Sequence, residues 1–507
     1  MDETSVDGDG ETLSRRRALQ GIGGVLGVLG GVSFGGSATA EDDWINVVEE
    51  GADPTGQESI NPVLDGLSLN DGTTLYFREG DYLMDDTVRH VDFHGLELRG
   101  DGATIVPAPD YDGDWLFKLG TSDRPGEDLV VDGFDFDFTA DNTGLRVLQA
   151  QVSDDLLVQD LEVRGEHDSG NKGPFLFDIT DPAGIGTIAN IRIPDGGEFS
   201  KNTPGDINVG PTGILVTRSH DGKLWVRDCE VGPWPDNGLY CSTEGGRVVV
   251  DGGVFKNSNI ASIRLSGDYS SIHDVTVIVD DRRDSDTNQR GIRLDGGKYN
   301  WIENTDIHLT EPTGYGISVL NDVEWARIQN SRVVVDGDVP TRAVSVSPNA
   351  GNIEIIGTEI EFNTPGQALY IQGPSSADAD PVYVLKSSVT GSGDGSNGRH
   401  AVRIERGNGT FDRFDVEQTG DDYRRGIKVT GDGCSFLWGD LETTHIPLVN
   451  DADGTKFRGI TARSLDGHEA MKFIDGSSGV NVIKSTLYNG VWEYGNVDVD
   501  YDSNWFL

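Results

Sequence analysis

The fold is decided by a repeated stretch that appears first as Gly213-Ile214-Leu215-Val216, next as Gly238-Leu239-Tyr240-Cys241, and again as Ser262-Ile263-Arg264-Leu265. In each copy a small residue precedes two apolar residues that are separated by a variable one. The motif returns at residues 291–294, 316–319, 343–346, 368–371, 401–404 and 426–429. The first apolar positions of the copies are separated by 25, 24, 29, 25, 27, 25, 33 and 25 residues. The alternation predicts short strands, and its repetition predicts a solenoid.

A second alternating motif lies between copies of the first and contains a polar or glycine corner. Its copies occupy residues 224–231, 301–307, 326–333 and 353–360. Two or three short strands in each 24–33 residues make one coil of a right-handed parallel β-helix, an all-β fold. Stacking of coils ~4.8 Å apart then supplies the core. Helical solenoids need a 3.6-residue period, which is absent, and propeller blades need four strands in a longer repeat.

The repeat indicates one long domain after a short leader. Related β patterns already occur at residues 96–100, 129–133 and 156–160. We therefore expect a single β-helix domain over residues 41–507, with residues 44–70 as its N-terminal cap. The segment at about 165–210 is rich in Gly, Pro and Asp and fits the period worst. It is predicted to be an insertion on one face, with a plain connecting loop as the alternative.

The first 40 residues have the features of an export signal. Three arginines stand at positions 15–17, an apolar, glycine-rich stretch follows at 22–34, and Ala38-Thr39-Ala40 resembles a cleavage site. This order predicts a twin-arginine signal peptide over residues 1–40 and a secreted or cell-surface protein. A second long apolar run is absent from the sequence, so no membrane span is expected in the mature chain.

The charge balance excludes one class of partner. The 507 residues include 86 acidic and 40 basic residues, which gives a formal net charge of −46. Nucleic-acid binding needs a basic face, so it is not expected. Acidic residues are spread along the whole chain, which is typical of a surface that stays soluble in high salt. Cys229 and Cys241 are expected to be buried free thiols, with a disulfide between them as the alternative.

Two groups of residues resemble known β-helix proteins. Residues 50–56 (Glu-Gly-Ala-Asp-Pro-Thr-Gly), a short helical stretch at 59–67 and residues 74–82 resemble the N-terminal segment of the pectate-lyase-like superfamily. Residues 210–214, 235–240 and 288–293 resemble secreted right-handed β-helix proteins of halophilic archaea. The resemblance implies a right-handed parallel β-helix. In this superfamily, lyases pair Ca²⁺ with a basic residue that removes the proton α to a uronate carboxylate.

The variable position of the first motif should point outward, because neighbouring residues of a strand face opposite sides. This outward row consists of Leu215, Tyr240, Arg264, Arg293, Ser318, Ser345, Tyr370, Arg403 and Lys428. Arg264 and Arg293 lie on consecutive coils, and like charges so close are unfavourable unless an anion bridges them. Guanidinium groups bind carboxylates in a bidentate manner. The row therefore predicts a groove that binds an acidic polysaccharide, with Tyr240 and Tyr370 stacking on sugar rings.

Further polar residues near this row complete the predicted site. Asp236, Asn237 and Asp295 are candidate substrate-binding residues, and the last lies in a second outward row. A cluster of carboxylates could hold calcium, a cation that prefers oxygen ligands; it consists of Asp280, Asp281, Asp284 and Asp286. By the resemblance, Arg264, Arg293 or Arg290 would act as the base of a lyase.

Other functions stay open from the sequence. The arginines of the row could simply pair with surface carboxylates, and the protein would then be a non-catalytic binding or structural protein of the cell surface. A polygalacturonase-like hydrolase needs two carboxylates, and Asp280-Asp281 with Asn304-Thr305-Asp306 superficially offer them. However, 228–230 and 330–332 occupy the same place in neighbouring coils, which favours a recurring corner.

Overall fold

The computed structural model describes residues 44–109, 111, 113–168, 172–199, 211–374, 380–396, 398–421 and 423–507. The chain divides into two units, and the second, Asp42–Leu507, contains every described residue. The export signal predicted at residues 1–40 lies outside the described residues.

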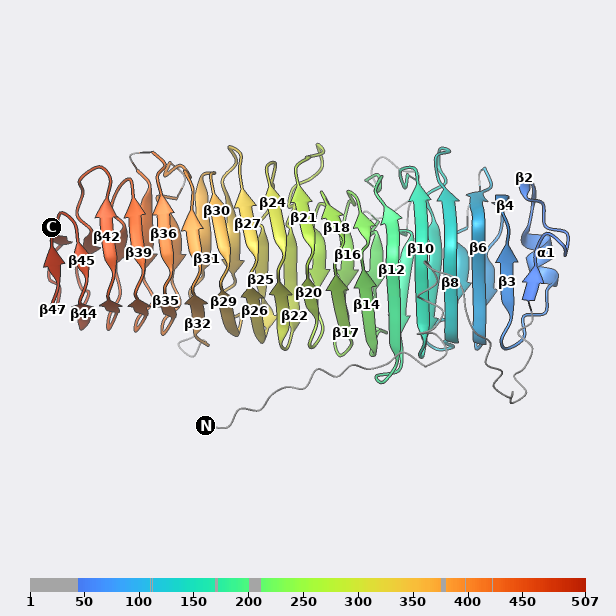
Figure 1. The fold of residues 1–507 in the computed structure, drawn as a ribbon, viewed down its shortest axis with the longest axis horizontal. Coiled ribbons are helices and arrows are strands. Elements are labelled where there is room, and N and C mark those ends of the chain that lie inside the picture. The colour runs from blue at the N-terminus through green and yellow to red at the C-terminus, as the bar shows by residue number, and fades with distance from the viewer. Residues whose placement is uncertain are drawn as a thin grey trace, which may run out of the picture. The chain divides into compact units, whose positions relative to one another are not determined.

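Within the described residues, parallel strands form two sheets that follow the chain coil by coil (Figure 1). Sheet 2 has 16 strands, one for each coil. They are β5 (Val88–His90), β7 (Trp115–Leu119), β9 (Arg146–Val152), β11 (Phe175–Ile179), β13 (Ile214–Val216), β16 (Asn237–Cys241), β19 (Ala261–Leu265), β22 (Ile292–Gly297), β25 (Ile317–Val323), β28 (Thr341–Val346), β31 (Gly366–Ile371), β34 (His400–Ile404), β37 (Arg425–Val429), β40 (Leu448–Asn450), β43 (Met471–Phe473) and β46 (Val491–Glu493).

Sheet 1 has 32 strands and, from β14 onward, receives two strands from each coil. They are β1 (Trp44–Asn46), β2 (Thr55–Ser59), β3 (Thr74–Phe77), β4 (Gly80–Met84), β6 (His94–Pro107), β8 (Glu127–Asp137), β10 (Leu156–Arg164), β12 (Ile185–Ile193), β14 (Lys223–Arg227), β15 (Glu230–Val231), β17 (Arg247–Asp251), β18 (Val254–Lys256), β20 (Ser271–His273), β21 (Thr276–Val279), β23 (Asn300–Glu303), β24 (Asp306–Leu309), β26 (Trp325–Gln329), β27 (Arg332–Val335), β29 (Asn352–Ile356), β30 (Glu359–Phe362), β32 (Val382–Leu385), β33 (Ser388–Thr390), β35 (Thr410–Asp412), β36 (Asp415–Gln418), β38 (Ser435–Leu437), β39 (Asp440–Thr443), β41 (Lys456–Arg458), β42 (Thr461–Ser464), β44 (Val480–Ile483), β45 (Thr486–Leu487), β47 (Val499–Asp502) and β48 (Trp505–Phe506).

The predicted parallel β-helix and its register are confirmed. Ile214 pairs with Leu239, Leu239 with Ile263, and Ile263 with Ile292, so one apolar residue stacks on the next. All four side chains are fully buried. A single coil leaves these side chains exposed, and only its neighbours cover them, so the core is continuous along the stack.

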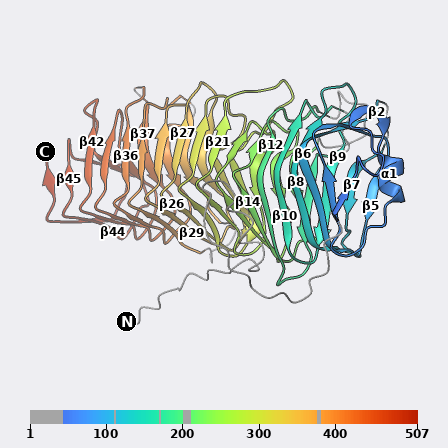
Figure 2. The ribbon, with the colours of Figure 1, turned by 45° about the vertical axis from the view of Figure 1, so that its right-hand side comes forward.

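The N-terminal end carries the short helix expected near residues 59–67. It forms as α1 (Asn61–Gly66), with a proline in its first turn, where a missing N–H has no cost. Ile60 and Leu64 are buried. The helix lies beside β5 and covers the first coil (Figure 2).

The segment predicted as an insertion at about 165–210 is partly regular. Strand β11 pairs with β9 and β13, and β12 pairs with β10 and β14, so both belong to the coils. Residues 175–193 are therefore mostly part of the solenoid, so the insertion predicted at about 165–210 does not extend over them. Residues 200–210 lie outside the described residues.

The cysteines are buried and free, so the expectation of buried thiols is confirmed for Cys229 and Cys241. Burial raises the pKa of the Cys229 thiol to about 12. Thiols that ionise so reluctantly are poor nucleophiles. Among the described residues, the structure has no helix that is long and apolar enough to cross a membrane.

Candidate functional site

The outward row predicted from the sequence is continuous on sheet 2. Tyr240 pairs with Leu215 and Arg264, and Arg293 pairs with Arg264 and Ser318. The register then continues through Ser345, Tyr370, Arg403 and Lys428.

A groove of about 570 Å³ lies over the middle of this row. Strands β16, β19, β22 and β25, the corners that follow them and the corner after β13 form it. Four of the predicted site residues line it: Tyr240, Arg264, Arg293 and Asp295. Further charged residues of the groove are Arg218, Glu244, Asp268, Lys298, Asp322 and Glu324.

The two arginines of the groove share one carboxylate. Arg264 donates from Nε and Nη2 to Asp295 Oδ2, both at 2.6 Å, and Arg293 donates from Nε to Asp295 Oδ1. All three side chains are about one-fifth exposed. The anion expected between the stacked arginines is therefore supplied by the protein itself, as in the alternative in which these arginines pair with carboxylates of the protein. The bridge carries a net charge of +1 and keeps both guanidinium groups in place.

The groove as a whole contains both signs of charge, whereas the sequence emphasised the cations of the row. Arg218 approaches Glu244 at 3.9 Å, and Lys298 approaches Glu324 at 3.8 Å. The first pair is about four-fifths exposed, so it contributes little to stability. The lining has four cations and five carboxylates, a formal charge of −1, so hydrogen-bond donors and acceptors are interleaved along the groove.

The two tyrosines predicted to stack on sugars are already in contact with arginines. The Arg264 guanidinium lies 4.2 Å from the centroid of the Tyr240 ring. Tyr370 lies five coils after Tyr240, with Arg342 at 4.4 Å and Arg403 at 5.4 Å from its ring. Each ring therefore uses at least part of one face in a cation–π contact within the protein.

Asp236 and Asn237 are placed differently from each other. Burial raises the pKa of the Asp236 carboxyl. A hydrogen bond from Thr212 Oγ1 at 3.0 Å and the positive charges of Arg264 and Arg293 partly oppose this rise. Asn237 is fully buried in β16. It faces the core with Leu239, so it cannot contact a ligand on the surface, contrary to the prediction.

Arg290 lies just before β22 and is partly buried. Burial lowers the pKa of its guanidinium, and the nearby charge of Arg293 lowers it further. Its Nε and Nη1 have no hydrogen-bond partner among the described residues. Its guanidinium carbon lies 5.9 Å from the centroid of the Tyr315 ring.

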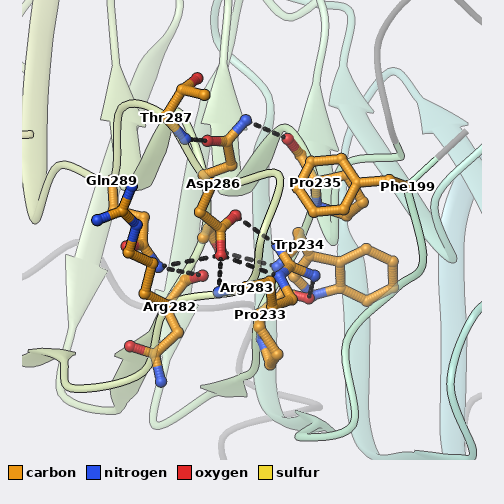
Figure 3. A network of polar contacts seen from close by, with 12 residues as sticks. Phe199, Pro233, Trp234, Pro235, Arg282, Arg283, Asp286, Thr287 and Gln289 are labelled. Atoms are coloured by element: carbon orange, nitrogen blue, oxygen red, sulfur yellow. Dashed lines mark hydrogen bonds and ion pairs between the residues drawn. The ribbon is translucent and has the colours of Figure 1, made fainter. Parts of the chain in front are cut away.

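The predicted calcium ligands do not form a cation site in the described structure. Asp286 is 1% exposed and binds Arg283, with Nη2 to Oδ1 and Nε to Oδ2 both at 3.1 Å (Figure 3). Asp280 accepts a hydrogen bond from Asn257, and Asp281 accepts one from a backbone N–H. No group of three His, Cys, Asp or Glu side chains suited to a metal occurs among the described residues. Calcium binding stays a prediction. A calcium site made of Asp280, Asp281, Asp284 and Asp286 is not formed in the described structure.

The same network fixes the loop that carries these aspartates. Arg283 donates from Nη1 to Gly197 O at 2.9 Å, and its guanidinium carbon lies 4.5 Å from the Phe199 ring centroid. Gln289 donates to Asp286 Oδ2 at 3.3 Å. Figure 3 shows Asp286 at the centre of these contacts. Arg283, which is bound by Asp286, therefore attaches the loop to the coil that contains residues 197–199.

Of the residues that superficially suggested a polygalacturonase, Asn304-Thr305-Asp306 occupy a repeated corner of sheet 1, whereas Asp280-Asp281 follow the end of β21. Asn304 has φ 51°, in the left-handed region, and Asn330, which follows one coil later, has φ 48°. The Thr305 N–H donates to Ser331 Oγ at 3.2 Å. Asn and Asp adopt this conformation more readily than most residues. The backbone of the corner therefore explains the Asn304-Thr305-Asp306 motif.

Sequence reasoning missed the groove residues that lie beyond the strands. Arg218, Asp268 and Lys298 stand a few residues after the first motif, where alternation no longer assigns a face. Their spacing after the motif predicts that they lie near the ends of the sheet 2 strands. It does not predict that their side chains point toward the groove.

No family model matches this chain, and no curated protein matches it. Several solved structures are similar. The catalytic unit of a GH87 alpha-1,3-glucanase from Streptomyces thermodiastaticus is 14% identical, with a TM-score of 0.38 over 93% of this chain and 70% of that one. PfbA, a surface adhesin of Streptococcus pneumoniae, is 14% identical, with a TM-score of 0.39 over 82% and 91%. An A-module of a mannuronan C-5 epimerase from Azotobacter vinelandii is 10% identical, with a TM-score of 0.31 over 91% and 99%. These similarities are too distant to support an argument about function.

Proposed function

We propose that the protein is exported by the twin-arginine pathway and binds an acidic polysaccharide in the groove of sheet 2. The observation that carries the proposal is the bridge Arg264–Asp295–Arg293 inside that groove. Asp295 uses Nε and Nη2 of Arg264 and Nε of Arg293. Nη1 and Nη2 of Arg293 make no hydrogen bond to the described residues, so they can bind an acidic group of a ligand.

A rigid pair of donors binds with less loss of conformational freedom than two separate side chains. Guanidinium groups also match the geometry of carboxylates and sulfates. The groove extends over successive coils, which are ~4.8 Å apart. This spacing is comparable to the length of one pyranose residue, so a polysaccharide along the helix axis meets a similar set of groups at each step.

Binding can be tested with purified mature protein and three acidic polysaccharides: polygalacturonate, alginate and chondroitin sulfate. Arg293→Ala is expected to weaken binding of the best of the three at least roughly tenfold, because a charge-assisted hydrogen bond contributes about 1.5–3 kcal/mol. Arg463→Ala is the matched control, since Arg463 lies on sheet 1 and pairs with Glu442. Equal affinities of the two variants, or no binding by the wild type, contradict the proposal.

Lyase-type cleavage is a second candidate, favoured by Arg290. Its Nε and Nη1 have no hydrogen-bond partner among the described residues, and it lies just before β22 without lining the groove itself. Burial and the charge of Arg293 lower the pKa of its guanidinium. In this reaction Arg290 accepts the proton α to the uronate carboxylate, the bond to the leaving sugar oxygen breaks, and that oxygen takes a proton from water. The product is an unsaturated uronate that absorbs in the ultraviolet.

The cleavage assay separates an enzyme from a binding protein. Arg290→Gln is expected to abolish the increase in ultraviolet absorbance while the variant still binds the polysaccharide. If the wild type binds but forms no unsaturated product, the protein is a binding or structural protein. No step of either proposal uses calcium.

A further inference from the structure

Three aromatic residues on consecutive coils directly follow, in the chain, residues that line the groove, and they do not line it themselves. The ring centroids of Tyr269 and Tyr299 are 5.3 Å apart with planes at 21°, and those of Tyr299 and Trp325 are 5.6 Å apart. Trp301 packs edge-on against Trp325 and supports it from sheet 1. We call Tyr269, Tyr299 and Trp325 the aromatic platform.

The platform adjoins the groove through its neighbours in the chain. Asp268, Lys298 and Glu324 line the groove. Each of them directly precedes one residue of the platform. The backbone of each platform residue is therefore next to the charged wall of the groove.

The two tyrosines occupy a backbone position that other coils fill with different residues. Tyr269 has φ 57° and Tyr299 has φ 56°, both in the left-handed region. The Tyr269 N–H donates to Lys298 O at 2.7 Å, in the next coil. Equivalent bonds to the next coil come from Gly72, Asp128, Asn408, Gly433 and Gly454. These residues also have left-handed φ, as do Gly95, Asp155 and Gly479 at the same corner.

A tyrosine in this conformation costs more conformational energy than Gly, Asn or Asp. Bulky residues also occur at the other corner, for example Lys386 and Trp438, so the conformation tolerates them without favouring them. The backbone therefore gives no reason for two adjacent tyrosines here. Backbone strain that persists at a surface position is a reason to look for a function.

Folding of the core does not explain the tyrosines either. Tyr269 is 49% exposed and Tyr299 is 45% exposed. Carbon atoms in contact are about 3.5–4 Å apart. Nearly parallel rings with centroids 5.3 Å apart are therefore displaced sideways, and part of each face stays open to solvent.

We propose that the aromatic platform binds the apolar faces of pyranose rings in the polysaccharide that occupies the groove. The proposal rests on the proposed function and deepens it: the groove binds the acidic groups, and the platform binds the sugar rings. Successive rings of the platform follow the coils, so they offer a contact at each step along the glycan.

The double variant Tyr269→Asn/Tyr299→Asn tests the platform without damage to the fold, because Asn suits the left-handed corner, as Asn408 does. Its melting temperature is expected to equal or exceed that of the wild type. Its affinity for the best-bound of polygalacturonate, alginate and chondroitin sulfate is expected to fall roughly tenfold. The control Tyr269→Phe/Tyr299→Phe keeps the rings and should retain most of the affinity.

Salt distinguishes this contribution from that of the groove. In 2 M NaCl screening is nearly complete, so the loss caused by Arg293→Ala should shrink, whereas the loss caused by the Asn double variant should persist. If the Asn double variant binds as well as the wild type while Arg293→Ala binds more weakly, the proposal that the platform binds sugar rings is wrong and the groove proposal stands. If the wild type binds none of the three polysaccharides, both proposals fail.

Discussion

Asp295 is the residue whose removal best separates two roles of the bridge. Asp295 could compete with a ligand, because it accepts hydrogen bonds from the same guanidinium groups. Alternatively it positions Arg264 and Arg293, because it binds both. We expect Asp295→Ala to weaken polysaccharide binding although it makes the groove more positive, because two unbridged arginines repel each other and become mobile. Stronger binding by Asp295→Ala would assign the competitor role instead. Urea unfolding should show a loss of about 1–2 kcal/mol.

His167 makes stability depend on pH in a predictable direction. Burial lowers the pKa of its imidazole to about 4, below the ordinary value of 6.5. Between these values the unfolded chain binds the proton and the folded chain does not. The contribution of His167 to the free energy of unfolding is therefore expected to be constant above about pH 6.5 and to fall by about 3 kcal/mol as the pH approaches 4.

Urea titrations from pH 7 to pH 4 measure this slope. The variant His167→Asn should reduce the slope by the contribution of His167, while His400 and His445, whose pKa values are also lowered, keep part of it. His94→Gln, which removes an exposed imidazole, should leave the slope unchanged. Identical slopes for the wild type and His167→Asn would contradict the assignment.

Alternation explains which single residues the sequence could predict. It placed Arg264 and Arg293 on the surface in the correct register. The same rule puts Asn237 on the buried face with Leu239, two residues later, so the prediction that it binds a ligand conflicted with the pattern itself. It also puts Asp295 on the face of Arg293, but the bridge between coils depends on the reach of the side chains, which the pattern does not specify.

At the scale of elements, the loop that contains Asp286 is held by a buried ion pair. Asp286→Ala leaves Arg283 without its carboxylate, and loss of one partner of a buried pair costs about 3–5 kcal/mol. Because Arg283 is one-quarter exposed, we expect a smaller loss, about 2–3 kcal/mol, in urea unfolding. The control Asp284→Ala removes a nearby carboxylate of the same loop.

The same measurement tests the calcium prediction. If Asp286 acts through Arg283, chelation of calcium with EDTA leaves the wild type unchanged and Asp286→Ala remains destabilised. If EDTA lowers wild-type stability as far as the substitution does, Asp286 is a calcium ligand and the ion-pair account is wrong.

Corners were the elements for which the sequence was most ambiguous. Repeated Asn, Asp and Gly indicated where the chain turns, as at Asn304 and Asn330. Nothing in the pattern gave the direction in which a side chain leaves the turn, so Lys298 and Tyr299 were not assigned to the groove and its margin. Loops that depend on distant contacts, such as Arg283 with Gly197, were also beyond a local pattern.

At the scale of the whole molecule, the period determines the fold because each coil needs its neighbours to complete the core. Strand pairs such as Ile317 with Val344 and Leu369 with Val402 reproduce the spacings of 27 and 33 residues, although the second includes a longer loop. Insertions at corners leave the register intact, which is why an irregular period still predicted the stack.

The net charge of −46 makes stability depend on salt. Carboxylates spread over the surface repel one another, and the Debye length falls from about 30 Å at 0.01 M to about 3 Å at 1 M salt. We expect the melting temperature to rise with NaCl and most of the rise to occur below about 1 M, where screening changes most. Sodium sulfate also strengthens apolar burial, so it should continue to stabilise the protein above that concentration. A melting temperature that is flat up to 1 M NaCl would show that ion pairs such as Arg327–Glu354 already balance the repulsion, and the acidic surface would then need another explanation.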